Sequence, residues 1–258
     1  PMKKDCYIVG NWKMNPASKK EALAILQKVK KTLPRAQKTE TVIIPPTLYL
    51  SALREKFRGT IFGVQTVAPD ETHAHTGCIS ATMAKGEGAT YAIIGHSEVR
   101  SAGASNEVVG EMLREALKAG LVPILCVGEK SRDHNGFYLH EIKTQLEDAL
   151  ALVPKSSYGK IIVAYEPLWA IGKDALREAT PEEFTEIAIF IRKVFSDIVG
   201  VKVATEITIL YGGSADEKSV GPFLSAGAQG FLVGRASLDA KKFAEIVSLS
   251  ELFYKTKR

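Results

Sequence analysis

The sequence predicts an α/β fold: an eight-stranded parallel β/α barrel that forms one domain over residues 1–258. Three observations support it, namely eight short apolar runs, helical segments between them, and a length of 258 residues. Alternating strands and helices imply parallel strands joined by right-handed crossovers. Eight such units in about 250 residues favour a closed barrel, with an open doubly wound sheet as the alternative.

The expected strands are rich in β-branched residues and lack polar alternation. Such runs are typical of parallel strands that helices cover on both faces. They span residues 6–10, 41–46, 60–65, 91–95, 123–128, 160–166, 207–212 and 230–234.

Segments with helical spacing of apolar residues separate these runs. They span residues 19–31, 51–57, 106–119, 139–152, 181–199 and 218–226. One start is marked clearly, because Thr180 can cap a helix, Pro181 suits its first position and two glutamates follow in the first turn. The repeating unit is therefore a strand followed by a helix.

Composition narrows the classes of function. No run approaches the roughly 20 apolar residues that span a bilayer, and the start has no signal-peptide hydrophobic region, so we expect a cytoplasmic protein without membrane contact. The cysteines Cys6, Cys78 and Cys126 form no CxxC pattern, which argues against disulfides and a metal site. The net charge of +5 is spread along the chain without a nucleic-acid motif, and therefore favours a small anionic substrate over nucleic acid.

Barrels of this type carry their functional residues just beyond the C-terminal ends of the strands. Polar and glycine-rich groups stand there: Asn11 to Lys13, His96 to Glu98, Glu166, Gly212 to Ser214, and Gly234 to Ser237. The glycine-rich turns after the last two strands can bring backbone N–H groups to a phosphate. Each turn alone is more typical of a tight connection, whereas two in adjacent loops favour phosphate binding.

Acid–base residues form the second group. Glu166 can take a proton from carbon, His96 can donate a hydrogen bond to a carbonyl, and Lys13 can stabilise a developing negative charge. A lone histidine at a strand end is more often structural, but beside a carboxylate and a lysine it favours catalysis. The apolar residues LWAI after the Glu166-Pro pair then indicate a lid rather than an oligomer contact.

Five motifs together resemble the triosephosphate isomerase family: NWKMN at 11–15, IIGHSEVR at 93–100, YEPLWAIGK at 165–173, LYGGS at 210–214 and FLVGRASL at 231–238. The resemblance covers nearly the whole chain. It implies a cofactor-free isomerase that interconverts dihydroxyacetone phosphate and D-glyceraldehyde 3-phosphate through an enediolate, under a closing lid.

The resemblance also implies roles for individual residues. It makes Glu166 the base and His96 the neutral electrophile, with Asn11 and Lys13 in contact with the substrate. It places four residues on the phosphate side of the substrate: Gly172, Ser214, Gly234 and Arg235. Supporting positions are Ser97, Glu98, Cys126, Tyr211 and Thr76, and of these Tyr211 would latch the closed lid together with Ser214.

The lid departs from the family pattern at its second hinge. Gly172 is followed directly by Lys173, without the usual Thr-Gly pair, and residues 174–179 are inserted before Thr180. Arg235 is another departure, since many members have a second glycine there. Its side chain is expected to point outward while its N–H meets the phosphate.

Two further positions that differ from the family pattern concern the expected homodimer. Cys78 and Val99 replace an acid and a base that the family joins across the dimer interface. Losing both the acid and the base destabilises the interface less than losing one of them, because no charge is left unpaired. A homodimer is still expected, with Thr76 reaching toward the active site of the partner.

Two other functions compete with this interpretation. One is a non-catalytic phosphosugar-binding barrel or scaffold dimer, and the joint presence of Asn11, Lys13, His96 and Glu166 argues against it. The other is a barrel isomerase that acts on a different sugar phosphate.

Overall fold

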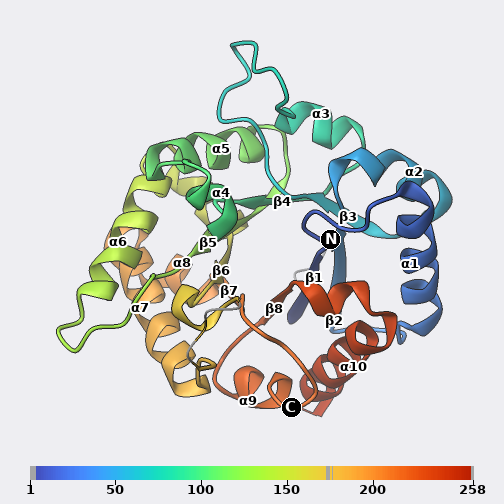
Figure 1. The fold of residues 1–258 in the computed structure, drawn as a ribbon. Helices are drawn as coiled ribbons and strands as arrows, with labels where there is room; N and C mark the ends of the chain where they lie inside the picture. Colours follow the sequence, from blue (N-terminus) through green and yellow to red (C-terminus); the bar gives the residue numbers. More distant parts are fainter. Residues whose placement is uncertain (1–3, 173–174, 176, 257–258) are drawn as a thin grey trace.

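Eight parallel strands close into a barrel in chain order, with the helices around it (Figure 1). The computed structural model describes residues 4–172, 175 and 177–256. Strand β1 (Cys6–Asn11) pairs with β2 (Thr39–Ile44) on one side and with β8 (Gly230–Val233) on the other, which closes the ring. The predicted barrel is confirmed, and the open sheet is excluded.

The other strands also lie on the predicted apolar runs, with ends that differ by at most two residues. They are β3 (Ile61–Val64), β4 (Tyr91–Ile94), β5 (Val122–Val127), β6 (Ile162–Tyr165) and β7 (Thr208–Tyr211). Alternate residues face the barrel interior and the helices, and both sets are buried, as Val9 inside and Ile8 outside illustrate. Burial on both faces explains why the strands lack polar alternation.

The helices include all six that the sequence predicts. They are α1 (Lys19–Thr32), α2 (Leu50–Lys56), α3 (Ala81–Gly86), α4 (Ser97–Ser101), α5 (Asn106–Lys118), α6 (Phe137–Leu150), α7 (Pro181–Val199), α8 (Val201–Glu206), α9 (Val220–Ser225) and α10 (Ala240–Thr256). The predicted cap of α7 is confirmed: Thr180 Oγ1 accepts from the Glu183 N–H, and the Glu183 carboxylate accepts from the Thr180 N–H. Helices α3, α4, α8 and α10 were not among the predicted segments.

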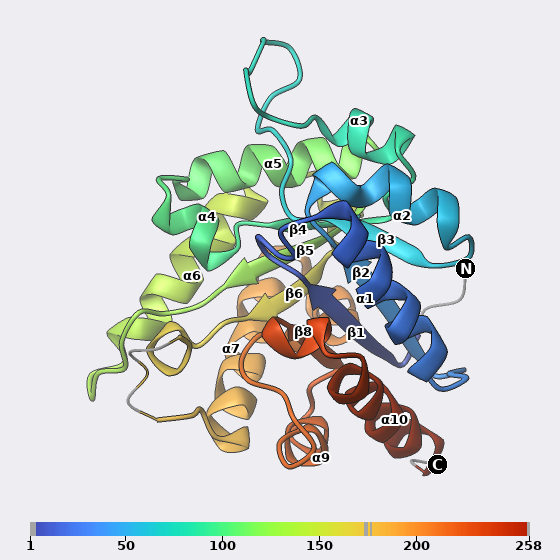
Figure 2. The ribbon, with the colours of Figure 1, turned by 45° about the vertical axis from the view of Figure 1, so that its right-hand side comes forward.

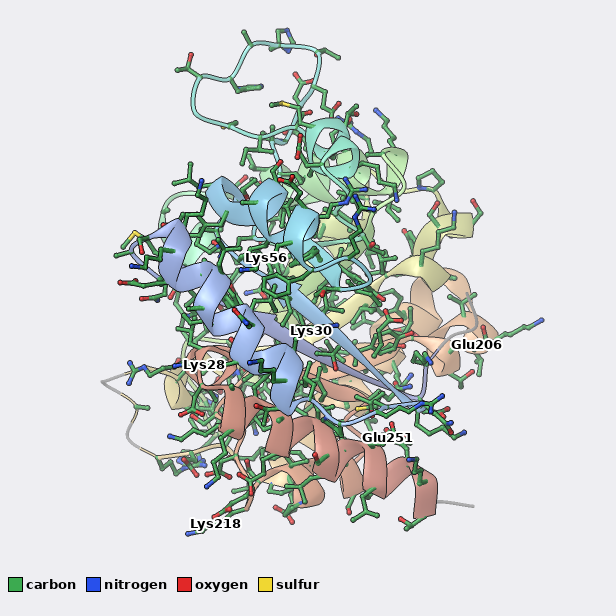
Figure 3. All side chains as sticks on the ribbon, turned by 90° about the vertical axis from the view of Figure 1, so that its right-hand side faces the viewer. Lys28, Lys30, Lys56, Glu206, Lys218 and Glu251 are labelled. Carbon is green, nitrogen blue, oxygen red and sulfur yellow. The ribbon has the colours of Figure 1, made fainter. Side chains whose placement is uncertain are left out.

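Helix α10 is fastened to the beginning of β2 by one buried carboxylate (Figure 3). Glu251 accepts hydrogen bonds from the backbone N–H groups of Gln37, Lys38 and Thr39, at 2.9 to 3.0 Å. These three N–H groups do not bond to a neighbouring strand of the sheet. The Glu251 carboxylate therefore supplies the acceptor that each of them needs. The contact lies at the amino ends of the strands, opposite the predicted site.

The connection between β3 and α3, residues 65–80, projects outward beyond the ring of helices (Figures 1 and 2). Residues 71–78 of this connection are exposed. The short 3₁₀ turns η1 (Thr47–Tyr49), η2 (Lys155–Lys160), η3 (Leu168–Ala170) and η4 (Arg235–Leu238) complete the regular structure of the described residues.

Candidate active site

Three of the predicted site residues are buried at the carboxyl ends of the strands. Asn11 ends β1, His96 lies two residues after β4, and Glu166 directly follows β6. Their exposed fractions are 5%, 6% and 4%. Since the strands are parallel, these ends meet at one mouth of the barrel, and the structure brings the three together there.

The Glu166 carboxylate contacts both His96 and Ser97. Its Oε1 atom lies 3.2 Å from His96 Nε2 and accepts from the Ser97 hydroxyl at 3.2 Å, while Oε2 accepts from the Ser97 N–H at 3.0 Å. The Glu166 N–H donates to Val127 O at 2.8 Å and so extends the pairing of β5 with β6. The carboxylate is thus held by a fixed backbone on one side and by the two Ser97 donors on the other.

His96 caps the short helix α4 with its own ring. Nδ1 accepts a hydrogen bond from the Glu98 N–H at 3.2 Å, so the proton of the neutral ring lies on Nε2. The Glu98 carboxylate is 3.8 Å from Nδ1, too far for a hydrogen bond. The Nε2–H group lies 3.2 Å from Glu166 Oε1 and can serve as a hydrogen-bond donor to an oxygen of the substrate.

Lys13 lies beside these residues in a left-handed backbone conformation, with φ of 52°. The Asn11 side chain accepts from the Lys13 N–H at 3.0 Å, and the Gln65 side chain donates to Lys13 O at 2.6 Å. The Lys13 ammonium bonds to Glu98 Oε1 at 2.6 Å. Gln65, which supports the Lys13 backbone, was not among the predicted site residues, although it stands at the end of a predicted strand.

The predicted phosphate side includes Gly234, which lies next to Lys13. A Cβ atom at Gly234 would be 3.8 Å from Lys13 Cε, so the turn after β8 and the lysine face the same space. Ser214 and Arg235 are exposed. Gly172 has a φ of 92°, and a Cβ atom there would meet nothing within 4 Å.

The predicted latch residues, Tyr211 and Ser214, make no hydrogen bond to a lid residue among those that the structure describes. Of the predicted second hinge, Lys173, Asp174 and Leu176 lie outside the described residues. Thr76 is exposed in the projecting connection, and this chain does not bring it to its own site.

Cys126 lies inside the barrel beneath Glu166. Burial raises the pKa of its thiol well above the ordinary value, and the nearby Glu166 charge adds to the effect. Arg100 closes this region by donating to Gly95 O at 2.9 Å and to Cys126 O at 3.3 Å. Cys126 therefore stays protonated and neutral, and acts by packing.

A buried carboxylate that was not among the predicted site residues anchors the beginning of the segment predicted to form a lid. Glu129 is fully buried, and its Oε1 atom accepts from Tyr165 Oη at 2.8 Å, Trp169 Nε1 at 2.8 Å and Arg132 Nε at 3.1 Å. The Leu168 N–H also donates to Glu129 O at 3.1 Å. In the sequence, only the position of Glu129 just after the apolar run of β5 indicated that it could belong to the site.

Together these groups can carry out acid–base chemistry at carbon. A carboxylate can take a proton, while a neutral imidazole N–H and an ammonium group stabilise the oxyanion that forms. Among the described residues, no set of three or more His, Cys, Asp or Glu side chains is placed to hold a metal ion. Within the same part of the chain, no helix is long and apolar enough to cross a membrane.

Comparison with known proteins agrees with this geometry. The model of the triosephosphate isomerase family matches residues 6–250. The triosephosphate isomerase of Dehalococcoides mccartyi is 41% identical over 244 residues, which cover 93% of this chain and 94% of the relative. Those of Saccharopolyspora erythraea and Mycobacterium bovis are 35% and 34% identical, each over 96% of this chain and 98% of the relative. The chain belongs to the triosephosphate isomerase family of enzymes.

Proposed function

We propose that the protein interconverts dihydroxyacetone phosphate and D-glyceraldehyde 3-phosphate through an enediolate, with Glu166 as base and His96 as electrophile. The observation that carries this proposal is the 3.2 Å contact between His96 Nε2 and Glu166 Oε1 at the buried mouth of the barrel. A proton acceptor and a hydrogen-bond donor this close together support a reaction at adjacent atoms of one substrate. Membership in the family supports the substrate pair.

In the proposed reaction, Glu166 takes a proton from the carbon next to the carbonyl group. The electron pair of that C–H bond forms the C=C bond of the enediolate, and the carbonyl electrons move onto oxygen. His96 Nε2–H and the Lys13 ammonium stabilise this oxygen. His96 then helps a proton move between the two oxygens, and Glu166 returns its proton to the neighbouring carbon.

Glu166 must first leave Ser97. In this structure its carboxylate is bonded to the N–H and hydroxyl groups of Ser97, at 3.0 and 3.2 Å. While these bonds persist, the carboxylate oxygens are directed at Ser97 rather than at a substrate carbon. The reactive arrangement is therefore one in which the substrate replaces Ser97 as the neighbour of Glu166.

The phosphate group would bind to backbone N–H groups at Gly172, Ser214, Gly234 and Arg235. The adjacent Lys13 ammonium offsets its negative charge. The apolar residues Leu168 to Ile171 would cover the enediolate, and Tyr211 would hold them in place together with Ser214. Excluding water in this way protects an intermediate that can otherwise expel phosphate.

A coupled assay tests this function. Conversion of D-glyceraldehyde 3-phosphate is followed through the NADH-dependent reduction of dihydroxyacetone phosphate, with Glu166→Gln as the variant. Loss of the base is expected to lower kcat by at least about 10²-fold. In D₂O, deuterium should enter the product at carbon, because the proton on Glu166 exchanges with solvent. Undiminished activity of Glu166→Gln would refute the role of this residue.

The alternative, a non-catalytic phosphosugar-binding barrel or scaffold dimer, predicts a different result. Such a protein would bind triose phosphate without turnover, and Glu166→Gln would leave the affinity unchanged. Isothermal titration with dihydroxyacetone phosphate, combined with the assay, separates the two functions.

We also propose that the protein acts as a homodimer in the cytoplasm. Met14, Leu48 and Met83 follow the successive strands β1, β2 and β3 and are 93%, 85% and 60% exposed. The projecting residues 65–80 also follow β3 (Figure 2). Exposed apolar side chains gathered in one sector are typical of a contact surface. Thr76, in this connection, would then reach the partner's site.

Light scattering during size exclusion tests the dimer. A mass of about twice 28.0 kDa is expected. Leu48→Glu should shift the protein toward monomer, whereas the matched change Leu252→Glu, at a 59% exposed residue of α10, should not. A fully active monomer would contradict the proposed dimer.

A further inference from the structure

The inserted segment before α7 places an arginine against the lid tryptophan. The guanidinium carbon of Arg177 lies 4.5 Å from the centre of the Trp169 ring system. A planar, delocalised cation stacks favourably on an indole face at this distance. Arg177 is in the stretch where the chain departs from the family pattern, so this contact is a feature of the chain itself.

Arg177 is itself held by the first turn of α7. Its Nη2 and Nη1 atoms donate to the two carboxylate oxygens of Glu183, at 2.6 and 2.9 Å, and Nη1 also donates to Glu178 O at 3.0 Å. Glu183 also accepts from the Thr180 N–H, as part of the cap of α7. The forked ion pair therefore joins Arg177 to a rigid helix of 19 residues.

Trp169 is thus fixed from two directions. Its indole N–H donates to buried Glu129, and its ring lies 4.5 Å from the Arg177 guanidinium carbon and, less closely, 5.6 Å from that of Arg132. Trp169 follows Glu166 by three residues, and in this arrangement the Glu166 carboxylate is bonded to Ser97 rather than free to face a substrate. A contact that stabilises Trp169 in this place also stabilises the arrangement in which Glu166 is occupied.

We propose that Arg177 is a positioning residue: through Trp169 and Glu183 it stabilises the arrangement seen here and sets the fraction of molecules in which Glu166 can reach the substrate. The inference rests on the proposed isomerase function. A residue that favours only the non-reactive arrangement lowers the fraction of molecules that can bind ligand. The apparent dissociation constant rises in proportion, because it is the intrinsic constant divided by that fraction. Removing it should therefore strengthen ligand binding.

Steady-state kinetics and ligand affinity test this role in Arg177→Gln. KM and the dissociation constant of 2-phosphoglycolate, whose carboxylate mimics the charge of the enediolate, should both fall about two- to fivefold, a size consistent with one exposed cation–π contact. kcat should fall or stay constant, because Arg177 makes no contact with the transition state and its removal therefore cannot stabilise that state. Arg177→Lys should behave like Arg177→Gln, since an ammonium group cannot replace the fork and the stacked plane.

Arg58→Gln provides the matched control. Arg58 is exposed and lies near the amino end of β3, at the opposite end of the barrel, and its replacement removes the same charge. It should leave KM and the 2-phosphoglycolate affinity unchanged. Equal KM and affinity in the wild-type protein and Arg177→Gln, or full rescue by Arg177→Lys, would overturn the proposal.

Tryptophan fluorescence without ligand separates this inference from the proposed function. Trp12 is fully buried, so a change in emission or in acrylamide quenching of Arg177→Gln, but not of Arg58→Gln, reports on Trp169. If the wild-type protein does not isomerise triose phosphates, the proposed function fails regardless of this result. If it does isomerise them and the emission of Arg177→Gln is unaltered, Arg177 does not position Trp169.

Discussion

Gly212 lies directly against Glu166. A Cβ atom built on Gly212 would be 2.9 Å from Glu166 Cγ and 3.1 Å from Tyr165 O. The glycine after β7 is therefore required by the neighbouring Glu166 side chain, because any larger residue would have to displace that side chain.

Gly212→Ala is expected to lower kcat by at least tenfold, since a displacement of about 1 Å at a reacting group is costly. The backbone φ of Gly212 is not positive, so alanine fits the main chain and the protein should still fold. The coupled assay measures the effect. Gly221→Ala in α9 is the control, because a Cβ atom there meets nothing within 4 Å. Equal activity of Gly212→Ala and the wild-type protein would show that Glu166 needs no such space.

Glu251 is expected to be important for stability rather than for activity. Glu251→Gln places an amide N–H₂ group among the three backbone donors, and should lower the free energy of unfolding by about 2 kcal/mol at pH 7. The urea midpoint measures this loss. Glu245→Gln, an exposed residue of the same helix, should have little effect.

The stability difference between the wild-type protein and Glu251→Gln should also depend on pH. Burial alone would raise the pKa of Glu251, but its backbone donors and Lys255 hold it below the ordinary value of 4.5. The carboxylate therefore contributes its full stabilisation above pH 4.5, and loses it as the pH falls through the folded pKa. A difference that stays constant down to pH 3 would contradict this assignment.

Cys6 and Cys126 are expected to resist thiol reagents in the native protein. Burial raises the pKa of Cys6 to about 12, with a smaller opposing effect from the hydroxyls of Ser250 and Thr39, and it raises the pKa of Cys126 well above the ordinary value. At pH 8 only about one Cys6 in 10⁴ is a thiolate, the reactive form. In Cys78→Ser, a disulfide reagent should thus modify no thiol before unfolding and two after it. Rapid modification of the native variant would show that one of the two sites opens.

The barrel and the central site residues could be predicted because they depend on regular features. Strand runs buried on both faces imply a parallel sheet, and a closed parallel sheet brings the residues after its strands to one mouth. His96 and Glu166 are distant in sequence, yet topology alone places them together.

The contacts around the lid could not be predicted in this way. The meeting of Glu129 with Trp169, and of Arg177 with Glu183, depends on the path of irregular loops, which no periodicity specifies. Helices α3 and α8 are six residues long, too short for a periodic pattern to appear. Helix α10 is different. Its buried Phe243, Ile246 and Val247 follow helical spacing, so this helix could have been predicted from the sequence.

The tautomer of His96 provides the last prediction. Its Nδ1 atom accepts the Glu98 N–H, so the neutral ring must carry its proton on Nε2. At pH 8 the ¹⁵N spectrum should show an unprotonated Nδ1 and a protonated Nε2 for this histidine, assigned by its absence in His96→Gln. Only the Nε2–H tautomer can donate toward the space that Glu166 faces, and a ring protonated on Nδ1 would break the cap of α4. A protonated Nδ1 would therefore exclude His96 as the hydrogen-bond donor to the substrate in this geometry, and the oxyanion would have to be stabilised by Lys13 alone.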